Sequence, residues 1–171
     1  MSLPDRLVPR LLAALLLLTL PAACNMRPLY GSVDSTTGSS VSADLASISL
    51  TVPNDRVEQV LQNQLGFRLN GGQPAGDRYT LDLRTETTTS SVLVRTIGGK
   101  PQARFVRVST SYQLKQGDTV LDSGALTREA SFDWSQQRFA NDRAQLDAED
   151  RAATALADDL YALLAGHFAA K

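Results

Sequence analysis

Three consecutive segments between residues 78 and 134 alternate apolar and polar residues, and this alternation constrains the fold more than any other feature. A period of two is typical of strands that bury one face. The runs Gly98 to Pro101 and Gly117 to Asp118 separate the segments and favour tight turns. We therefore expect three antiparallel strands in a meander, covering about residues 78–93, 105–114 and 119–134.

The alternation also predicts which face of each strand is buried. In the middle strand the expected inner residues are Val106, Val108, Thr110, Tyr112 and Leu114, and the outer ones are Phe105, Arg107, Ser109, Ser111 and Gln113. The last strand has the expected inner residues Leu126, Ala130, Phe132 and Trp134. Gly124 interrupts the apolar pattern of that strand and is a candidate for a β-bulge.

A shorter strand and a helix precede the meander. Alternation over residues 48–52 predicts a strand that Pro53 ends, with the inner residues Ile48, Leu50 and Val52. Asn54 or Asp55 can cap the helix that follows, and the glycines at 71–72 end it. Apolar residues recur in it at intervals of three and four, as one buried stripe requires: Val57, Val60, Leu61, Leu65 and Leu69.

An Ala-rich segment from about Asn141 to Phe168 is the clearest helix in the chain. Its apolar stripe consists of Leu146, Ala153, Leu156, Leu160, Leu163 and Leu164. The element order is then β-α-β-β-β-α. Two helices with one stripe each can cover only one face of the sheet. We predict an α+β fold, a two-layer sandwich of a four-stranded, mostly antiparallel sheet with two helices on one face and a polar opposite face.

The N-terminus has the order of a secretory signal peptide. Arg6 and Arg10 precede the apolar run 11–20, and small residues follow at 22–23. Ten apolar residues are too few for a permanent membrane span. We predict a signal peptide over 1–23, a Ser/Thr/Gly-rich flexible tether within 24–43, and one α+β periplasmic domain over 44–171.

Cys24 is the only cysteine, so no internal disulfide can form. The stretch from Leu20 to Cys24 resembles a bacterial lipobox, and this resemblance implies cleavage before Cys24 and lipidation of its thiol and new amine. Two or more acyl chains would anchor the protein firmly. The alternative is an ordinary secreted protein with a leftover thiol. Asn25 stands where Asp would signal retention in the inner membrane, so the resemblance implies the outer membrane.

Little in the sequence suggests catalysis or metal binding. His167, the only histidine, falls at the end of the terminal helix, where a partly buried structural histidine is the simplest interpretation. Gly98 to Lys100 lacks the frame of a phosphate-binding loop. We predict no enzyme, no metal site and no cofactor. The acidic residues of the terminal helix are interleaved with Arg143 and Arg151, and we interpret them as a solvated face. They are Asp147, Glu149, Asp150, Asp158 and Asp159.

A basic cluster around the second and third strands is the candidate binding site. Without residues 1–23 the net charge is near minus two, which argues against a nucleic-acid partner. A local cluster could still bind a phosphorylated ligand. Protection of a sheet edge is an equally good explanation. The candidate residues are Arg95, Lys100, Arg104 and Arg107, with Arg84 nearby.

Directly after Cys24 and the pair Asn25 and Met26, the chain reads RPLYG over residues 27–31. This resembles the CGFRPLYG start of the LPS-assembly lipoprotein LptE family, alphaproteobacterial type. Diffuse matches follow over most of the mature chain, including the run 62–65 and the segment 139–152. Asn25 and Met26 replace the Gly and Phe of the family pattern.

The resemblance implies a lipid-anchored outer-membrane protein that acts as plug and assembly partner of the β-barrel LptD in lipopolysaccharide transport. The partners would be LptD, lipopolysaccharide and the outer membrane. A polar sheet face agrees with this, because large barrels have polar interiors. Two alternatives stay open. The protein could be a lipoprotein subunit of a phospholipid or solvent ABC transport system, or it could be a purely structural envelope lipoprotein.

Overall fold

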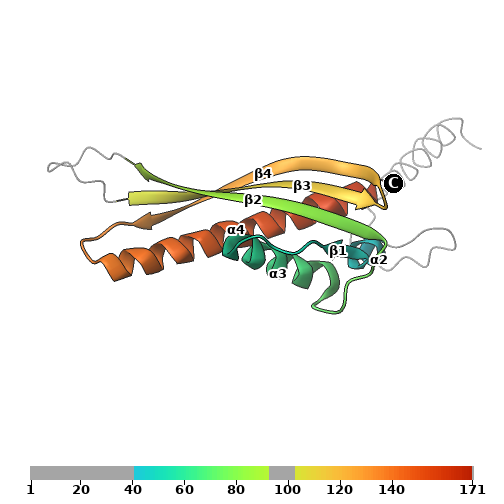
Figure 1. The fold of residues 1–171 in the computed structure, drawn as a ribbon, viewed down its shortest axis with the longest axis horizontal. Coiled ribbons are helices and arrows are strands. Elements are labelled where there is room, and N and C mark those ends of the chain that lie inside the picture. Colours follow the sequence, from blue (N-terminus) through green and yellow to red (C-terminus); the bar gives the residue numbers. More distant parts are fainter. Residues whose placement is uncertain (1–40, 93–102, 171) are drawn as a thin grey trace, which may run out of the picture. The chain divides into compact units, whose positions relative to one another are not determined.

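The structure, a computed structural model, describes residues 41–92 and 103–170 (Figure 1). Its strands form one sheet in the order β1-β2-β3-β4, in which β1 is parallel to β2 and the remaining pairs are antiparallel. The predicted α+β fold is confirmed. The elements are α2 Val41–Ala46, β1 Ile48–Leu50, α3 Arg56–Asn70, β2 Tyr79–Val92, β3 Ala103–Gln116, β4 Thr119–Asp133 and α4 Arg138–Ala169.

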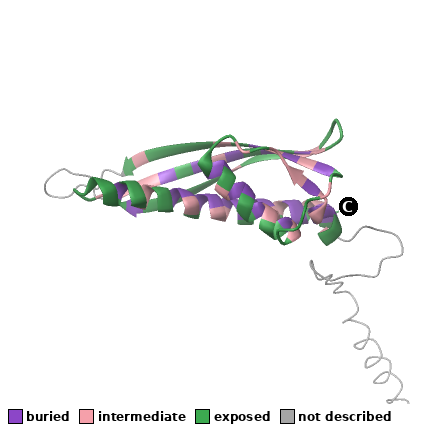
Figure 2. Ribbon diagram, turned by 60° about the horizontal axis from the view of Figure 1, so that its bottom comes forward, coloured by how far each residue is buried: buried purple, intermediate pink, exposed green. Residues whose placement is uncertain are grey.

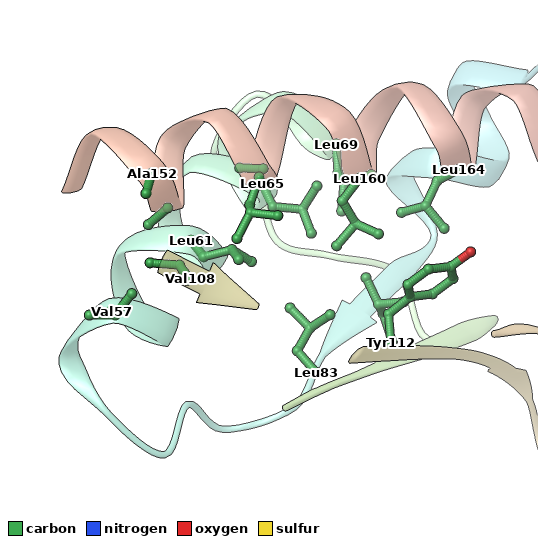
Figure 3. Packing of buried hydrophobic residues seen from close by; sticks show 14 of the residues in the cluster. Val57, Leu61, Leu65, Leu69, Leu83, Val108, Tyr112, Ala152, Leu160 and Leu164 are labelled. Carbon is green, nitrogen blue, oxygen red and sulfur yellow. The ribbon is translucent and has the colours of Figure 1, made fainter. Parts of the chain in front are cut away.

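The helices lie on one face of the sheet, as predicted, and the core lies between the two layers (Figures 1 and 2). The inner residues expected in β3 are all buried, and so are Ala130 and Phe132 of β4. Leu126 and Trp134 are partly buried against the same core. Figure 3 shows the side chains that meet between α3, α4 and the sheet, among them Leu61, Leu65, Leu83, Tyr112, Leu160 and Leu164.

Helix α3 begins and ends where the sequence predicts. Asp55 is its N-cap, and the Asp55 carboxylate accepts a hydrogen bond of 2.8 Å from the backbone N–H of Glu58. At the other end Gly71 adopts a φ of 65°, the left-handed conformation that glycine tolerates best, and its N–H donates to the carbonyl of Phe67. Each end therefore has a local cause in the sequence.

The N-terminal part of the domain differs from the prediction in two respects. Residues 41–46 form the short helix α2, so the last residues of the predicted tether are helical. The first strand ends at Leu50, and Val52, expected to be buried, is 85% exposed. Thr51 still donates a hydrogen bond to the carbonyl of Leu81, but Pro53 lacks an N–H and so cannot continue the ladder.

Two further predictions in β4 and α4 are wrong. Gly124 pairs in regular register with Tyr112, and the bulge lies instead where Leu114 and Lys115 face residues 120–122. Gly124 serves close packing, because a Cβ there would lie 3.0 Å from the Tyr112 ring. Leu146 is 38% exposed because α3 begins at Arg56, opposite Glu149, and the first turns of α4 have no neighbouring α3 turn to cover them.

Candidate functional site

The predicted binding residues do not form a single described cluster. Cys24, Arg95 and Lys100 lie outside the described residues, as does the predicted turn at 98–101. Arg104 and Arg107 both belong to β3 but differ by an odd number of positions, so they project from opposite faces of the sheet. Arg104 is on the helix-covered face and Arg107 is on the open face.

Arg104 is stacked on an aromatic ring. Its guanidinium carbon lies 3.3 Å from the centroid of the Trp134 ring, just beyond the end of β4. A guanidinium over the face of a Trp ring is attracted by the ring quadrupole. The Nε atom of Arg104 is buried and has no hydrogen-bond partner among the described residues. The stack fixes the position of this cation without neutralising its charge.

Arg107 is neutralised by its neighbour on the open face. Its side chain forms an ion pair of 2.6 Å with Glu129 of β4 and lies 5.8 Å from the centroid of the Phe105 ring. Arg84 is exposed on the same face of β2. Among the described residues, the arginines of the open face are therefore Arg107, which is paired, and Arg84, and they do not form a dense basic patch.

Hydroxyl groups and charged pairs cover most of this open face. Ser109 and Thr127 are hydrogen-bonded across β3 and β4 at 3.0 Å, and Lys115 forms an ion pair with Asp82 across β3 and β2. A polar hollow of about 680 Å³ lies over the end of the sheet where β1 joins it. Its lining includes Thr51, Asn54, Arg84, Gln113, Lys115 and Ser123. Such a surface suits a hydrated or polar partner.

The acids of α4 have a role that the sequence analysis did not predict. Asp147 pairs with Arg151 within the helix, as a solvated face would. The others reach different elements: Glu149 and Asp150 bind Arg56 of α3, Asp158 binds Arg68 of α3, and Asp159 binds Arg128 of β4. These ion pairs hold α4 to α3 and to the sheet.

Hydrogen bonds shift the pKa values of Arg56 and of the Arg128–Asp159 pair. Hydrogen bonds to Glu149 and then to Asp150 raise the pKa of Arg56. The hydrogen bond from Arg128 holds the pKa of Asp159 below its usual value, and the bond raises the pKa of Arg128. The charged forms are therefore favoured by the fold.

A buried carboxylate links α3 to the edge of β2. Glu58 is 1% exposed, and its Oε2 accepts a hydrogen bond of 3.0 Å from the backbone N–H of Thr85. Its Oε1 accepts from the backbone and side-chain amides of Asn54 and from the Gln62 amide, each at 3.3 Å. The sequence did carry a signal for it, because Asp55 and Glu58 have capping-box spacing.

His167 takes part in a polar cluster at the C-terminal end of α4. Its Nδ1 lies 3.8 Å from Asp122, which also accepts a hydrogen bond of 3.1 Å from the Tyr112 hydroxyl. Burial, and then the hydrogen bond to Asp122, raises the pKa of Tyr112 to about 12. The expected structural histidine at a helix end is confirmed in its position and partial burial.

Within residues 41–92 and 103–170, no group of three His, Cys, Asp or Glu side chains is placed to hold a metal ion. In the same residues, no helix has the length and apolar character that crossing a membrane requires.

Comparison with known proteins shows a shared fold but no sequence family. No family model matches the chain, and no curated protein matches it either. A candidate lipoprotein from Caulobacter crescentus CB15 has a similar structure, with 22% identity, a TM-score of 0.63, and coverage of 77% of this chain and 97% of that chain.

Two other solved structures have the same arrangement. The minor lipoprotein from Acinetobacter baumannii is 19% identical, with a TM-score of 0.51 and coverage of 70% of this chain and 88% of that one. The rare lipoprotein B from Shewanella oneidensis is 13% identical, with a TM-score of 0.53 and coverage of 70% and 92%. At these identities the likeness establishes the fold, which this chain shares with three proteins described as lipoproteins.

Proposed function

We propose that this chain is an outer-membrane lipoprotein that plugs the LptD β-barrel and assists its assembly for lipopolysaccharide transport, by binding and not by catalysis. The observation that carries the proposal is the open sheet face. Along β2, β3 and β4 it presents hydroxyl groups and paired charges, including the Arg107–Glu129 pair. The interior of a large barrel is polar, and a plug must match it.

Two other observations support the proposal. The fold is similar to those of proteins described as lipoproteins, including a rare lipoprotein B. The RPLYG motif at 27–31 begins three residues after the lipobox-like Cys24 and resembles the start of the LptE family. Lipid on Cys24 would hold the domain at the outer membrane, where the barrel lies.

Lipopolysaccharide is the second proposed partner. Its lipid A phosphates could accept hydrogen bonds from cations near the β2–β3 connection, which we propose to be Arg95, Lys100 and Arg104. Charge-assisted hydrogen bonds are roughly twice as strong as neutral ones. Of these three residues, Arg104 lies in the described part of the chain. Its guanidinium group stacks on the Trp134 ring and forms no ion pair within residues 41–92 and 103–170.

The test is to identify what copurifies with the tagged lipoprotein from detergent-solubilised outer membranes. The proposal predicts a large β-barrel in stoichiometric amount. An ABC-transport complex would instead support the phospholipid or solvent alternative, and recovery of the lipoprotein alone would support a purely structural role. Cys24→Ala serves as the control for anchoring, because it should leave a larger, unlipidated precursor. A mature N-terminus other than modified Cys24 would contradict the lipoprotein assignment.

A further inference from the structure

The outer edge of β2 is covered in its first half. Odd-numbered residues of this strand direct their backbone groups away from β3, as three contacts show. The Tyr79 N–H donates to the carbonyl of Ser47, the Leu81 carbonyl accepts from Thr51, and the Thr85 N–H donates to the Glu58 carboxylate. The carboxylate of α3 thus takes the place that a continued β1 would occupy.

The second half of this edge is open within the described part of the chain. From Thr87 to Ser91 the outward N–H and C=O groups have no hydrogen-bond partner among residues 41–92 and 103–170, because β1 pairs only as far as Leu81 and the hydrogen bond from α3 is made at Thr85. Thr87, Thr89 and Ser91 are exposed. This stretch contains no charge, proline or bulge.

The other edge of the sheet, formed by β4, is protected. A bulge distorts it near Leu121, and Arg128 places a charge on its inner face. Arg151 of α4 donates a hydrogen bond of 2.9 Å to the outward carbonyl of Ser131. Bulges, inward charges and capped backbone groups are the usual means of preventing strand addition. The two edges therefore differ in their availability to another strand.

We infer that the edge from Thr87 to Ser91 receives an extended segment of a partner polypeptide as an additional strand. A row of N–H and C=O groups on every second residue matches the backbone of another extended chain, which is the basis of recognition by strand addition. Hydroxyl side chains on both faces of this stretch favour a segment that is polar and uncharged.

The size of the edge identifies the kind of partner. Stable interfaces use about 20–30 residues on each side, and this edge offers only the stretch 87–91. A second copy of the chain, paired through this edge alone, would be held weakly. The edge suits a partner that also contacts the long polar face, and the barrel of the proposed function is such a partner. The inference therefore rests on that function. Pairing at this edge would fix how the partner's segment is aligned along β2.

The experiment compares Thr89→Pro with the matched control Ala125→Pro. Each removes one N–H that points away from the neighbouring strand, because Ala125 has the same parity in β4 as Ser131, and Ala125 contributes no hydroxyl or charge to the open face. Proline is tolerated on such edge positions. We expect the amount of copurified barrel to fall by about two- to tenfold for Thr89→Pro and to stay unchanged for Ala125→Pro. Equal yields for both variants would overturn the inference.

Amide hydrogen exchange of the wild-type chain gives a second readout that does not depend on variants. In the free chain the amides of Thr87, Thr89 and Ser91 should exchange fast, and in the purified complex they should be protected. Protection already present in the free chain, or growing with its concentration, would mean that the chain itself or a second copy covers the edge, and would overturn the inference. If no barrel copurifies with the wild type, the proposed function fails instead.

Discussion

The two faces of the sheet consist of alternate residues of the same strands, yet they are held in different ways. On the inner face, side chains such as Val108 and Leu114 are fully buried against α3 and α4. On the outer face, hydroxyl groups and the Arg107–Glu129 pair remain in contact with solvent. Burial of apolar area drives folding, whereas exposed ion pairs contribute little. We therefore expect stability to depend on the inner face and recognition on the outer one.

Leu160→Ala should give the largest loss of stability, because Leu160 is 1% exposed between α4 and the sheet (Figure 3). Truncating a buried leucine costs about 2–5 kcal/mol of unfolding free energy. Urea denaturation of the mature domain would measure it. Leu146→Ala in the same helix is the matched control and should change stability by less than about 1 kcal/mol, since Leu146 is 38% exposed. An unchanged stability of Leu160→Ala would place α4 outside the core.

Glu58→Gln should be the next most harmful change, although it alters few atoms. The carboxylate accepts hydrogen bonds through both oxygens, from Thr85 on one side and from Asn54 and Gln62 on the other. An amide would direct its NH₂ group toward one set of donors and leave buried groups unsatisfied, at about 1–3 kcal/mol. Glu86→Gln, exposed on the outer face of β2, is the control. A melting temperature equal to that of the control would contradict this role.

The elements could be predicted from sequence because their signals are local. Alternation in 105–114 located the inner face of β3, and Asp55 and Gly71 located the ends of α3. The contacts of charged groups could not be predicted in the same way. Arg56 and Glu149 are 93 positions apart, and only the folded packing of α3 on α4 shows that they meet.

The candidate site was harder to predict for the same reason. Arg104 and Arg107 are close in sequence and both basic, so the sequence suggested one cluster. The pleat of β3 places them on opposite faces, where Trp134 and Glu129 give them different environments. Counting charges along a chain therefore overestimates a patch whenever the charges belong to one strand and alternate in parity.

Tyr112→Phe should remove a pH dependence that belongs to the inner face. Because the pKa of Tyr112 is raised from 10.0 to about 12, the folded state retains the phenol proton longer than the unfolded state. This contribution to stability is complete below pH 10 and decreases as pH rises from 10 to 12. Stability of the wild type, measured by denaturation over this range, should fall more steeply than that of the variant.

At neutral pH the same variant should lose about 0.5–1.5 kcal/mol, since the hydrogen bond to Asp122 is removed. His167→Gln is a useful comparison, because it changes the other neighbour of Asp122 and leaves the phenol in place. If the alkaline slopes of the wild type and the Phe variant were the same, ionisation of Tyr112 would not be linked to folding.

The smallest effect is expected on the outer face, at the Arg107–Glu129 pair. Both side chains are about half exposed, at 53% and 47%, so solvent screens their attraction. A double-mutant cycle with Arg107→Gln and Glu129→Gln should give a coupling energy of about 0.2–1 kcal/mol that decreases with added salt. A coupling energy larger than the loss of unfolding free energy in Leu160→Ala would mean that the outer face is also a major source of stability. A small coupling combined with a clear loss of copurified barrel in Arg107→Gln would separate the two faces, since the pair would then matter for the partner and not for the fold.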